Sequence, residues 1–504
     1  MRIYKKKEVL NLIESMRIIH QRLFGIIQRD NDKKIECLSI LQETAITMGE
    51  SLETTNESGI TSLVKILEEY CEDVYQCSIA ENLNDNKFYV NQMDKKILTV
   101  KKILMDEIES DKLEVVFLPY KADMWTSMES IWKAAMKDSD CNVTVVPIPY
   151  YDIGNTYNIR LKYEADRFPS YVEIISYKDY CVEENHPDMI FIHNPYDDCN
   201  TLTRVPQSYY SSALREVCGC LIYSPYFTVG AYKPESQEFM FTMPGVYNAD
   251  YVVAQSQKAK ELFERYGKES NKILAYGSPK IDAVINSKKE HGKIPAEWRE
   301  KLEGKKIFLL NTHLSYFPKA YLYANSLENY AMKFHREIME TFLNRDDCAL
   351  IWRPHPLLKN MLQDKFPELL EFIKYFENSV READNGIVDE QGSYFESFNC
   401  SDAMISTWSS LINEYMVTQK PILIMQRKID VETDKRSPIN RNVNYFRVGK
   451  DRISFQQFRD NVIKGFDPLY ELRMEAVKRA FPNLDGTAGE KIYNYLKKTY
   501  NGGK

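Results

Sequence analysis

The fold class follows from one stretch of the chain, Ser401-Asp-Ala-Met-Ile-Ser-Thr-Trp-Ser-Ser-Leu-Ile-Asn-Glu-Tyr-Met416, and from the segment Lys420-Pro-Ile-Leu-Ile-Met425 that comes after it. Residues 403–405 are apolar and predict a short buried strand, and the polar residues after them predict a turn. A helix is expected next, with Ser409 or Ser410 as its cap. The Lys-Pro pair ends this helix, and the apolar run behind it predicts another buried strand. The stretch therefore predicts a βαβ unit in a parallel sheet.

The start of this helix is a candidate phosphate site. A helix that begins at the carboxyl edge of a parallel sheet points unpaired N–H groups into the crevice there, and Ser409 and Ser410 add two hydroxyls. Glu414, one turn into the helix, can accept hydrogen bonds from a ribose. The alternative is an ordinary capped helix, which is the commoner case because caps far outnumber phosphate sites.

Length and composition indicate a multidomain globular protein. The chain has 504 residues, more than one hydrophobic core usually holds, so two or three domains are expected. The formal net charge of −7 argues against a dedicated nucleic-acid-binding protein. The ten cysteines form no CxxC pair and no signal peptide is evident, so reduced thiols in a cytoplasmic protein are expected. Since no apolar run approaches the roughly 20 residues that span a bilayer, any membrane contact should be peripheral, at the inner face of the cell membrane.

Residues 1–110 are expected to form an all-α module. They contain no proline, and their apolar residues recur three and four positions apart, as in amphipathic helices. We expect these helices to mediate homo-oligomerisation or partner binding, or to pack along the next domain, because their apolar stripes need a partner. The run Lys5-Lys6-Lys7 suggests membrane-surface contact as an alternative. Packing is favoured, since charge runs are usually solvated faces.

From residue 111 the pattern changes to buried strands that alternate with helices and end in polar, glycine- or proline-bearing loops. This pattern predicts a doubly wound, Rossmann-like α/β domain over residues 111–290. Ligands of such sheets bind where the carboxyl ends of the strands meet the helices. The residues expected there are Tyr120, Lys121, Asp123, Tyr150, His193, Asn194 and Tyr226.

A second Rossmann-like unit is expected over residues 291–504, after a charged linker. It begins with Lys306-Ile-Phe-Leu-Leu-Asn-Thr-His313, continues with Ala349-Leu-Ile-Trp-Arg-Pro-His-Pro356, and reaches the βαβ unit described above. The predicted fold class is therefore α/β, with two Rossmann-like domains behind an all-α module. A ligand cleft between the two domains is the expected consequence, because facing sheet edges leave a crevice at the junction.

Strand-end motifs of the second unit can carry chemistry. In Trp352-Arg-Pro-His-Pro356 the prolines fix the backbone just past a strand, so Arg353 and His355 are expected at the rim of the cleft. The arginine can neutralise a diphosphate, and the histidine can donate a hydrogen bond to a phosphoryl oxygen or carry a proton. His313 follows a strand in the same way. The alternative is that these side chains only satisfy backbone carbonyls in a tight turn.

Several well-known motifs are missing from the sequence. It has no HExxH, GxGxxG, P-loop, GxSxG or zinc-ligand spacing. No metal site is expected, and the metalloprotease, dinucleotide-dehydrogenase, NTPase and hydrolase classes lose their usual support.

An ordered set of motifs resembles a known family. The set comprises Gly277-Ser-Pro-Lys-Ile-Asp282, Lys306-Ile-Phe-Leu-Leu-Asn-Thr-His313, Trp352-Arg-Pro-His-Pro356, Ser401-Asp-Ala-Met-Ile-Ser, Ser409-Ser410 with Glu414-Tyr415, Lys420-Pro421 and Asp485-Gly-Thr-Ala-Gly-Glu-Lys-Ile492. Together these motifs resemble the CDP-glycerol glycerophosphotransferases, the primases and polymerases of teichoic acid, over residues 240–495 or so. The helical N-terminus lies outside the resemblance.

The resemblance implies a GT-B-like arrangement of the two domains and a phosphotransferase activity. The donor would be CDP-glycerol or a similar nucleotide-activated alcohol, bound as substrate on the second domain with no further cofactor. Its diphosphate would lie at Ser409 and Ser410, Gly277 and Ser278 would contribute to the same site, and the loop of Arg353 and His355 would hold the leaving cytidine phosphate. The acceptor, a lipid-linked or glycan precursor of a cell-wall or capsule polymer, would enter from the first domain.

The sequence departs from the family at two places. The family carries a Trp-His-Gly segment whose histidine is thought to act as the base, whereas the corresponding segment here, Leu221-Ile-Tyr-Ser-Pro-Tyr-Phe227, has no histidine. Tyr226, or His193 from a neighbouring strand end, is then expected to serve as the base. Thr407-Trp408 also replaces the Asp-Tyr pair that usually precedes the two serines.

Two other function classes remain open at this point. One is a GT-B glycosyltransferase that uses a nucleotide sugar. The other is a non-catalytic scaffold that keeps the fold and recruits partners through its helical module.

Overall fold

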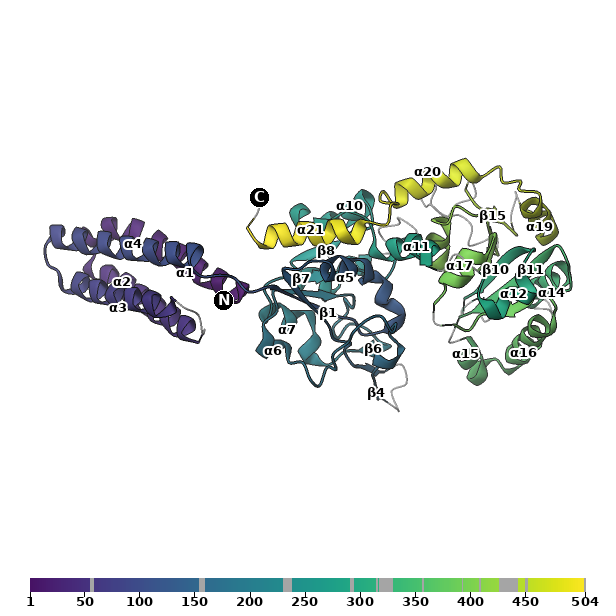
Figure 1. Cartoon of the computed structure of the whole chain (residues 1–504), viewed down its shortest axis with the longest axis horizontal. Helices are drawn as coiled ribbons and strands as arrows, with labels where there is room; N and C mark the ends of the chain where they lie inside the picture. The colour runs from purple at the N-terminus through teal and green to yellow at the C-terminus, as the bar shows by residue number, and fades with distance from the viewer. Residues whose placement is uncertain are drawn as a thin grey trace.

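The computed structural model describes residues 1–54, 59–153, 159–229, 238–290, 294–313, 316, 330–355, 358–391, 393–407, 409–425, 443–448 and 452–502. It consists of a helical module and two α/β domains, which lie in a row along the longest axis of the molecule (Figure 1). The fold class expected from the sequence, two Rossmann-like domains in a GT-B-like arrangement behind an all-α module, is confirmed.

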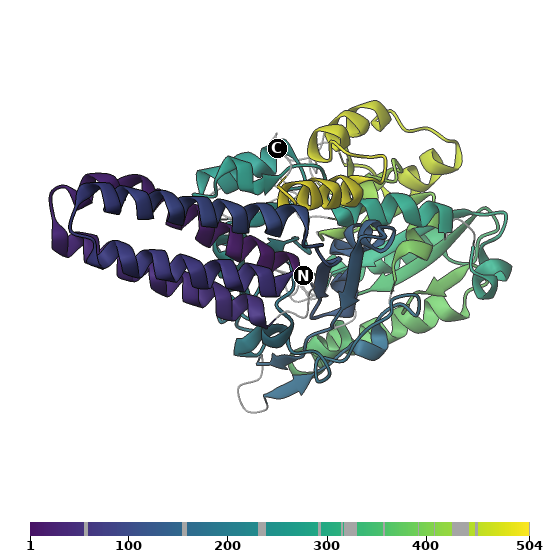
Figure 2. The ribbon, with the colours of Figure 1, turned by 60° about the vertical axis from the view of Figure 1, so that its left-hand side comes forward.

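The helical module is a four-helix bundle of α1 (Ile3–Ile27), α2 (Asn31–Glu53), α3 (Ile60–Ile79) and α4 (Leu83–Asp106). Each helix packs against two others, so the apolar stripes close on a shared core. In α1, for example, Val9, Ile13 and Met16 are buried at spacings of three and four residues. The bundle projects away from the α/β body in both views (Figures 1 and 2).

The basic run at the start of α1 attaches the bundle to the rest of the chain. Lys6 donates to the carbonyl of Ile108 at 2.6 Å, and the ammonium of Lys7 lies over the ring of Tyr500 in the last helix. Lys5 donates to Ser51 within the bundle. The run is therefore not a free basic face, which removes the observation that suggested membrane-surface contact. In the part of the chain that the structure describes, no helix is both long and apolar enough to cross a lipid bilayer.

The first α/β domain is built on a parallel sheet in the order β2-β1-β5-β7-β8-β9. The strands are β1 (Leu113–Leu118), β2 (Cys141–Val145), β5 (Met189–Ile192), β7 (Leu221–Tyr223), β8 (Tyr251–Val253) and β9 (Ile273–Leu274). A small antiparallel sheet of β3 (Tyr150–Asp152), β4 (Arg160–Lys162) and β6 (Thr203–Arg204) lies beside them. The helices are α5 (Glu129–Met136), α6 (Val182–Asn185), α7 (Ser211–Glu216), α9 (Pro244–Asn248) and α10 (Gln257–Arg265), with the short 3₁₀ helix η1 (Ala122–Ser127) after β1.

The second α/β domain has the doubly wound order β12-β11-β10-β13-β14-β15, again parallel. Its strands are β10 (Lys306–Thr312), β11 (Cys348–Pro354), β12 (Gly386–Val388), β13 (Ala403–Ser406), β14 (Ile422–Ile424) and β15 (Tyr445–Phe446). The helices are α12 (Arg299–Leu302), α14 (Tyr330–Phe342), α15 (Leu358–Lys365), α16 (Pro367–Glu382), α17 (Phe395–Cys400), α18 (Leu411–Met416), α19 (Phe455–Ile463) and α20 (Tyr470–Ala480). The βαβ unit predicted for residues 401–425 is formed by β13, α18 and β14.

Two helices connect the domains. Helix α11 (Pro279–Glu290) lies between them, and α21 (Ala488–Tyr500) packs on α5 of the first domain. The segment 291–504 was expected to form the second domain, but Ile492 and Leu496 of α21 are buried in the core beneath the first sheet. Gly489 permits this contact, since a Cβ atom there would lie 2.3 Å from the Ser130 hydroxyl of the neighbouring segment. The last helix therefore belongs structurally to the first domain (Figure 1).

Candidate active site

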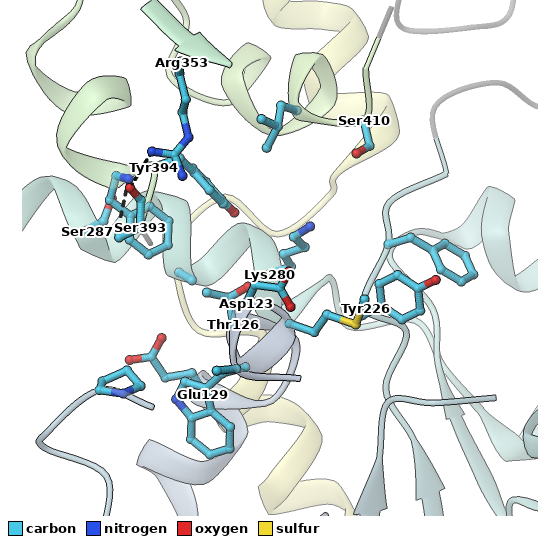
Figure 3. A pocket seen from close by; sticks show the side chains of 18 of the residues that line it. Asp123, Thr126, Glu129, Tyr226, Lys280, Ser287, Arg353, Ser393, Tyr394 and Ser410 are labelled. Atoms are coloured by element: carbon cyan, nitrogen blue, oxygen red, sulfur yellow. Dashed lines mark hydrogen bonds between the residues drawn. The ribbon is translucent and has the colours of Figure 1, made fainter. Parts of the chain in front are cut away.

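A cavity of about 670 Å³ opens between the two α/β domains, at the carboxyl ends of both sheets. Its walls come from the loops after β1 and β7, from α5 and α11, and from the loops after β10, β11, β12 and β13 (Figure 3). This is the position where doubly wound sheets bind ligands.

Two histidines form part of the second-domain wall. β10 and β11 are paired in register with Thr312 opposite Pro354, so His313 and His355, the next residues, are also neighbours. Their rings meet edge to face, with centroids 5.4 Å apart. The backbone N–H of His355 donates to the carbonyl of Thr312 at 3.0 Å, which fixes the start of its loop. The predicted strand-end placement of both histidines thus brings them together at the cavity.

The environment of His355 favours its uncharged form. Burial, together with the neighbouring His313, lowers the pKa of His355 to about 4. Near neutral pH its imidazole is therefore neutral and can donate a hydrogen bond from one ring nitrogen, but it carries no permanent charge.

Arg353 lines the cavity but is engaged within its own domain. Nη1 donates to the carboxylate of Asp389 at 2.7 Å and to the carbonyl of Ser393 at 2.9 Å, and Nη2 donates to the carbonyl of Gln391 at 3.0 Å. Asp389 follows β12, the strand beside β11, so sheet pairing brings the two side chains together. Arg353 thus holds the segment that carries Tyr394 in place. These contacts match the alternative expected from the sequence, in which its side chain satisfies backbone carbonyls in a tight turn.

Ser409 and Ser410 line the cavity at the start of α18, as expected from the sequence. The Ser409 hydroxyl accepts from the N–H of Leu411 at 3.3 Å. α18 has only six residues, so its dipole is small. Trp408, which precedes the serines, lies outside the described residues.

Glu414 does not face the cavity. Its side chain is fully buried, with one carboxylate oxygen 2.8 Å from the ammonium of Lys280 on α11. The other oxygen accepts a hydrogen bond from the Tyr394 hydroxyl. Glu414 therefore holds two cavity-lining residues in place, and the expected contact with a ribose is not available to it. Sequence reasoning missed both partners, although Lys280 lies inside the Gly277–Asp282 motif.

Gly277 and Ser278 also lie outside the cavity wall. Gly277 has a φ of 116° and a Cβ atom there would come within 2.9 Å of Asn483, so only glycine fits. The Ser278 carbonyl accepts from the N–H groups of Ile281 and Asp282 at the start of α11. The two residues shape the turn before α11, which corrects their assignment to the nucleotide site.

The first-domain wall carries two carboxylates, Asp123 in η1 and Glu129 in α5. Glu129 accepts from the Tyr171 hydroxyl at 2.5 Å and pairs with Lys133 at 2.9 Å. Asp123 makes no hydrogen bond or ion pair with any side chain or backbone group that the structure describes. Burial raises its pKa above the ordinary value for an aspartate. Asp123 is expected at this sheet edge from the sequence, which assigns it no role.

His193 is not in a position to act as a base. Its side chain is fully buried, Nε2 accepts from the backbone N–H of Tyr120 at 3.1 Å, and Nδ1 contacts the Ser127 hydroxyl at 3.1 Å. Burial lowers its pKa to about 3. Its ring braces the loop after β1, and this geometry argues against the expected base role.

Tyr226 does line the cavity, as expected from the sequence. Its hydroxyl shares a hydrogen bond of 2.8 Å with that of Tyr196. Burial raises the pKa of Tyr226 well above the ordinary value for a phenol, so the phenolate form is disfavoured. Tyr226 is placed to contact a substrate but is a poor base.

Within the described ranges, no group of three His, Cys, Asp or Glu side chains is arranged to hold a metal ion.

A sequence comparison agrees with this geometry. The family described as CDP-Glycerol:Poly(glycerophosphate) glycerophosphotransferase matches residues 232–498, more than half of the chain. The chain belongs to this family. The resemblance seen in the ordered motifs is thereby confirmed, and the protein is a member of a transferase family. Comparison with curated proteins yields no match.

Solved structures that are similar to this chain have low sequence identity to it. A Listeria monocytogenes protein assigned as a UDP-N-acetylglucosamine 2-epimerase is 15% identical, with a TM-score of 0.50 over 78% of this chain and 98% of its own. The wall teichoic acid polymerase TagF, in a variant soaked with CDPG, is 14% identical, with a TM-score of 0.48 over 84% of this chain and 99% of its own. These similarities concern the fold alone.

Proposed function

We propose that this protein transfers an alcohol phosphate from a CDP-alcohol, glycerol phosphate from CDP-glycerol in the first instance, to a hydroxyl of a cell-surface glycopolymer precursor. The observation that carries the proposal is the interdomain cavity of a glycerophosphotransferase-family chain, with the His313–His355 pair on one wall and an unpaired carboxylate on the other. The family's description names both a CDP-glycerol donor and a poly(glycerophosphate) acceptor, which makes a teichoic-acid type of product the first candidate.

The donor is assigned to the second-domain wall. Diphosphate oxygens can accept hydrogen bonds there from the hydroxyls of Ser409 and Ser410 and from the imidazole N–H groups of His313 and His355. Lys280 adds a cation at the domain junction, with 13% of its side chain exposed. Negative charge that develops on the leaving phosphate is stabilised by donors that are already in place.

His355 is assigned to the leaving cytidine phosphate. Because its imidazole is neutral, it can donate a hydrogen bond to the oxygen that receives the electron pair of the broken bond. Arg353 supports this arrangement by fixing the adjoining segment.

A binding panel tests the donor class. CDP-glycerol, CDP-ribitol, UDP-sugars and CMP-sugars are added to the full chain, with CDP and CMP as controls, and the melting temperature is measured. A bound ligand raises it by mass action. Stabilisation by a CDP-alcohol beyond that by CDP supports the proposal. Stabilisation by a nucleotide sugar alone would indicate a GT-B glycosyltransferase, and no stabilisation by any ligand would indicate a non-catalytic scaffold.

A transfer assay tests the reaction. The donor that binds is labelled in its alcohol, and the acceptors are a lipid-linked glycerol phosphate primer and a glycan primer without phosphate. Release of cytidine monophosphate together with label in the acceptor is expected. Release without labelled acceptor would mean hydrolysis and would contradict the transferase assignment.

A further inference from the structure

Neither of the two residues expected to act as the base for the acceptor hydroxyl is suited to that role in the structure. Alcohol attack on phosphorus requires removal of the hydroxyl proton. Two residues were expected to remove it. His193 is fully buried and its pKa is lowered, and the pKa of Tyr226 is raised, so its phenolate form is disfavoured. Another residue that lines the cavity is therefore needed as the base.

Two carboxylates line the cavity in the described part of the chain, and they differ in their contacts. Glu129 is held by Tyr171 and Lys133. Asp123 has no such partner, and its side chain is open to solvent through the cavity. In Figure 3 it lies near the centre of the cavity, between Arg353 on the second-domain side and Glu129 on the first-domain side. A carboxylate with unused lone pairs inside a binding cavity can accept a proton from a bound hydroxyl.

The local fold presents Asp123 at this position. β1 ends at Leu118, and η1 begins at Ala122 and turns the chain across the sheet edge. The N–H of Ala122 donates to Glu164 at 3.1 Å, and the buried ring of Trp125 anchors the other end of the turn. Asp123 is therefore carried on a braced turn rather than on a free loop.

We propose that Asp123 is the catalytic base that accepts the proton of the acceptor hydroxyl. This inference rests on the proposed function and assigns the base to a carboxylate at the strand end after β1, in place of His193 or Tyr226.

The step balances in atoms and charge. The acceptor oxygen forms a bond to the β-phosphorus of the CDP-alcohol while its proton moves to a carboxylate oxygen of Asp123. The bond from that phosphorus to the bridging diphosphate oxygen breaks, and this oxygen keeps the electron pair and leaves in cytidine monophosphate. Asp123 then releases the proton to water.

The charges around Asp123 set its proton affinity. The surrounding protein displaces part of the water around its carboxylate, and this desolvation is the largest influence: it raises the pKa of Asp123 above the ordinary value, which strengthens it as a base. The charged groups that face it are Lys121, Glu164, Arg167 and Lys280. The negative charge of Glu164 adds to the rise in pKa, and the three cations oppose it, so Asp123 is more basic than an ordinary aspartate.

The test compares Asp123→Asn, Asp123→Glu and Asp123→Ala with the wild type in the full chain. Asp198→Asn is the matched control, because it removes an exposed carboxylate of the first domain that does not line the cavity. We expect Asp123→Asn to lower turnover by about 100-fold or more, as is typical when a general base is lost. Donor affinity, from the melting-temperature shift with CDP-glycerol, should stay within about threefold of wild type.

Two readouts separate a base from a structural residue. The wild-type rate should fall as the pH drops through the raised pKa of Asp123, and this acid limb should disappear in Asp123→Asn and return in Asp123→Glu. Added formate should restore part of the activity of Asp123→Ala, since a small carboxylate can occupy the vacated space.

The results that would overturn the inference are specific. Turnover of Asp123→Asn within about threefold of wild type would refute the base role, as would an unchanged acid limb or a rate loss explained wholly by weaker donor binding. A wild-type protein that transfers from no cytidine donor would instead refute the proposed function, before any variant is compared.

Discussion

Lys280 of α11 places its ammonium 2.8 Å from a carboxylate oxygen of Glu414 in α18, and thereby joins the interdomain helix to the second domain beside the cavity. Glu414 is fully buried and also accepts from Tyr394, so the three side chains form one unit. The ion pair between Lys280 and Glu414 therefore fixes α11 against α18, the helix that follows Ser409 and Ser410 on the cavity wall.

Replacement of Lys280 by methionine is expected to destabilise the protein by about 3 kcal/mol, because it leaves a buried carboxylate without its cation. The double variant Lys280→Met/Glu414→Gln should recover most of this loss, since no unpaired charge remains. Urea denaturation of the single and double variants measures both. A single variant as stable as the wild type would show that the pair contributes little.

The variant His355→Ala is expected to lose about 100-fold or more in turnover while donor affinity changes little, because the imidazole N–H that donates to the leaving group is removed. Steady-state kinetics with the donor identified by the panel measure this. His186→Ala, which changes a histidine of the first domain outside the cavity, should retain wild-type turnover. Wild-type turnover in His355→Ala would show that His355 has only a structural role in the loop after β11.

The stability of the protein should fall as the pH drops below about 6.5, because buried histidines resist protonation. Burial lowers the pKa of His335 to about 4. In the interval between these values the unfolded chain binds a proton that the folded chain does not, so acid favours unfolding. In His335→Gln the slope of unfolding free energy against pH should be smaller by up to about 1.4 kcal/mol per pH unit. An unchanged slope in denaturation curves between about pH 4 and pH 6.5 would contradict this.

The substitution Gly489→Ala should loosen the last helix from the first domain. Its Cβ would lie 2.3 Å from the Ser130 hydroxyl and 2.5 Å from the backbone nitrogen of Ile131, and such overpacking typically costs about 1–3 kcal/mol. Gly25→Ala is the matched control, because nothing lies within 4 Å of a Cβ there and alanine is the better helix former. Thermal unfolding should show a lower midpoint for the first variant and an equal or higher one for the second.

Deletion of residues 1–110 tests whether the bundle braces the body or mediates self-association. We expect a lower melting temperature, because Arg2 donates to the carbonyls of Asn185 and His186 and Lys7 lies over Tyr500. Light scattering of both proteins reports the mass. Unchanged mass and unchanged melting temperature in a soluble truncated protein would remove both roles.

The elements and the main strand-end positions could be predicted from the sequence, because they depend on local periodicity. His313 and His355 follow buried strands, and in a parallel sheet adjacent strands end at the same edge, so their proximity was foreseeable. The four helices of the bundle could be read in the same way from apolar residues three and four positions apart.

The partners of charged and polar side chains could not be predicted, because they depend on how separate elements pack. Glu414 has the sequence context of a ribose contact, yet α11 places Lys280 against it. His193 follows a strand as His313 does, but the turn after β1 covers it. Both of its ring nitrogens form hydrogen bonds with residues of that turn, Tyr120 and Ser127. The residues next to Asp123 in the sequence form no motif. Only the packing of the two α/β domains against each other places its carboxylate, without a partner, in a cavity. Periodicity and backbone chemistry act over a few residues and specify elements, whereas burial and charge pairing arise between residues far apart in the chain and specify the site.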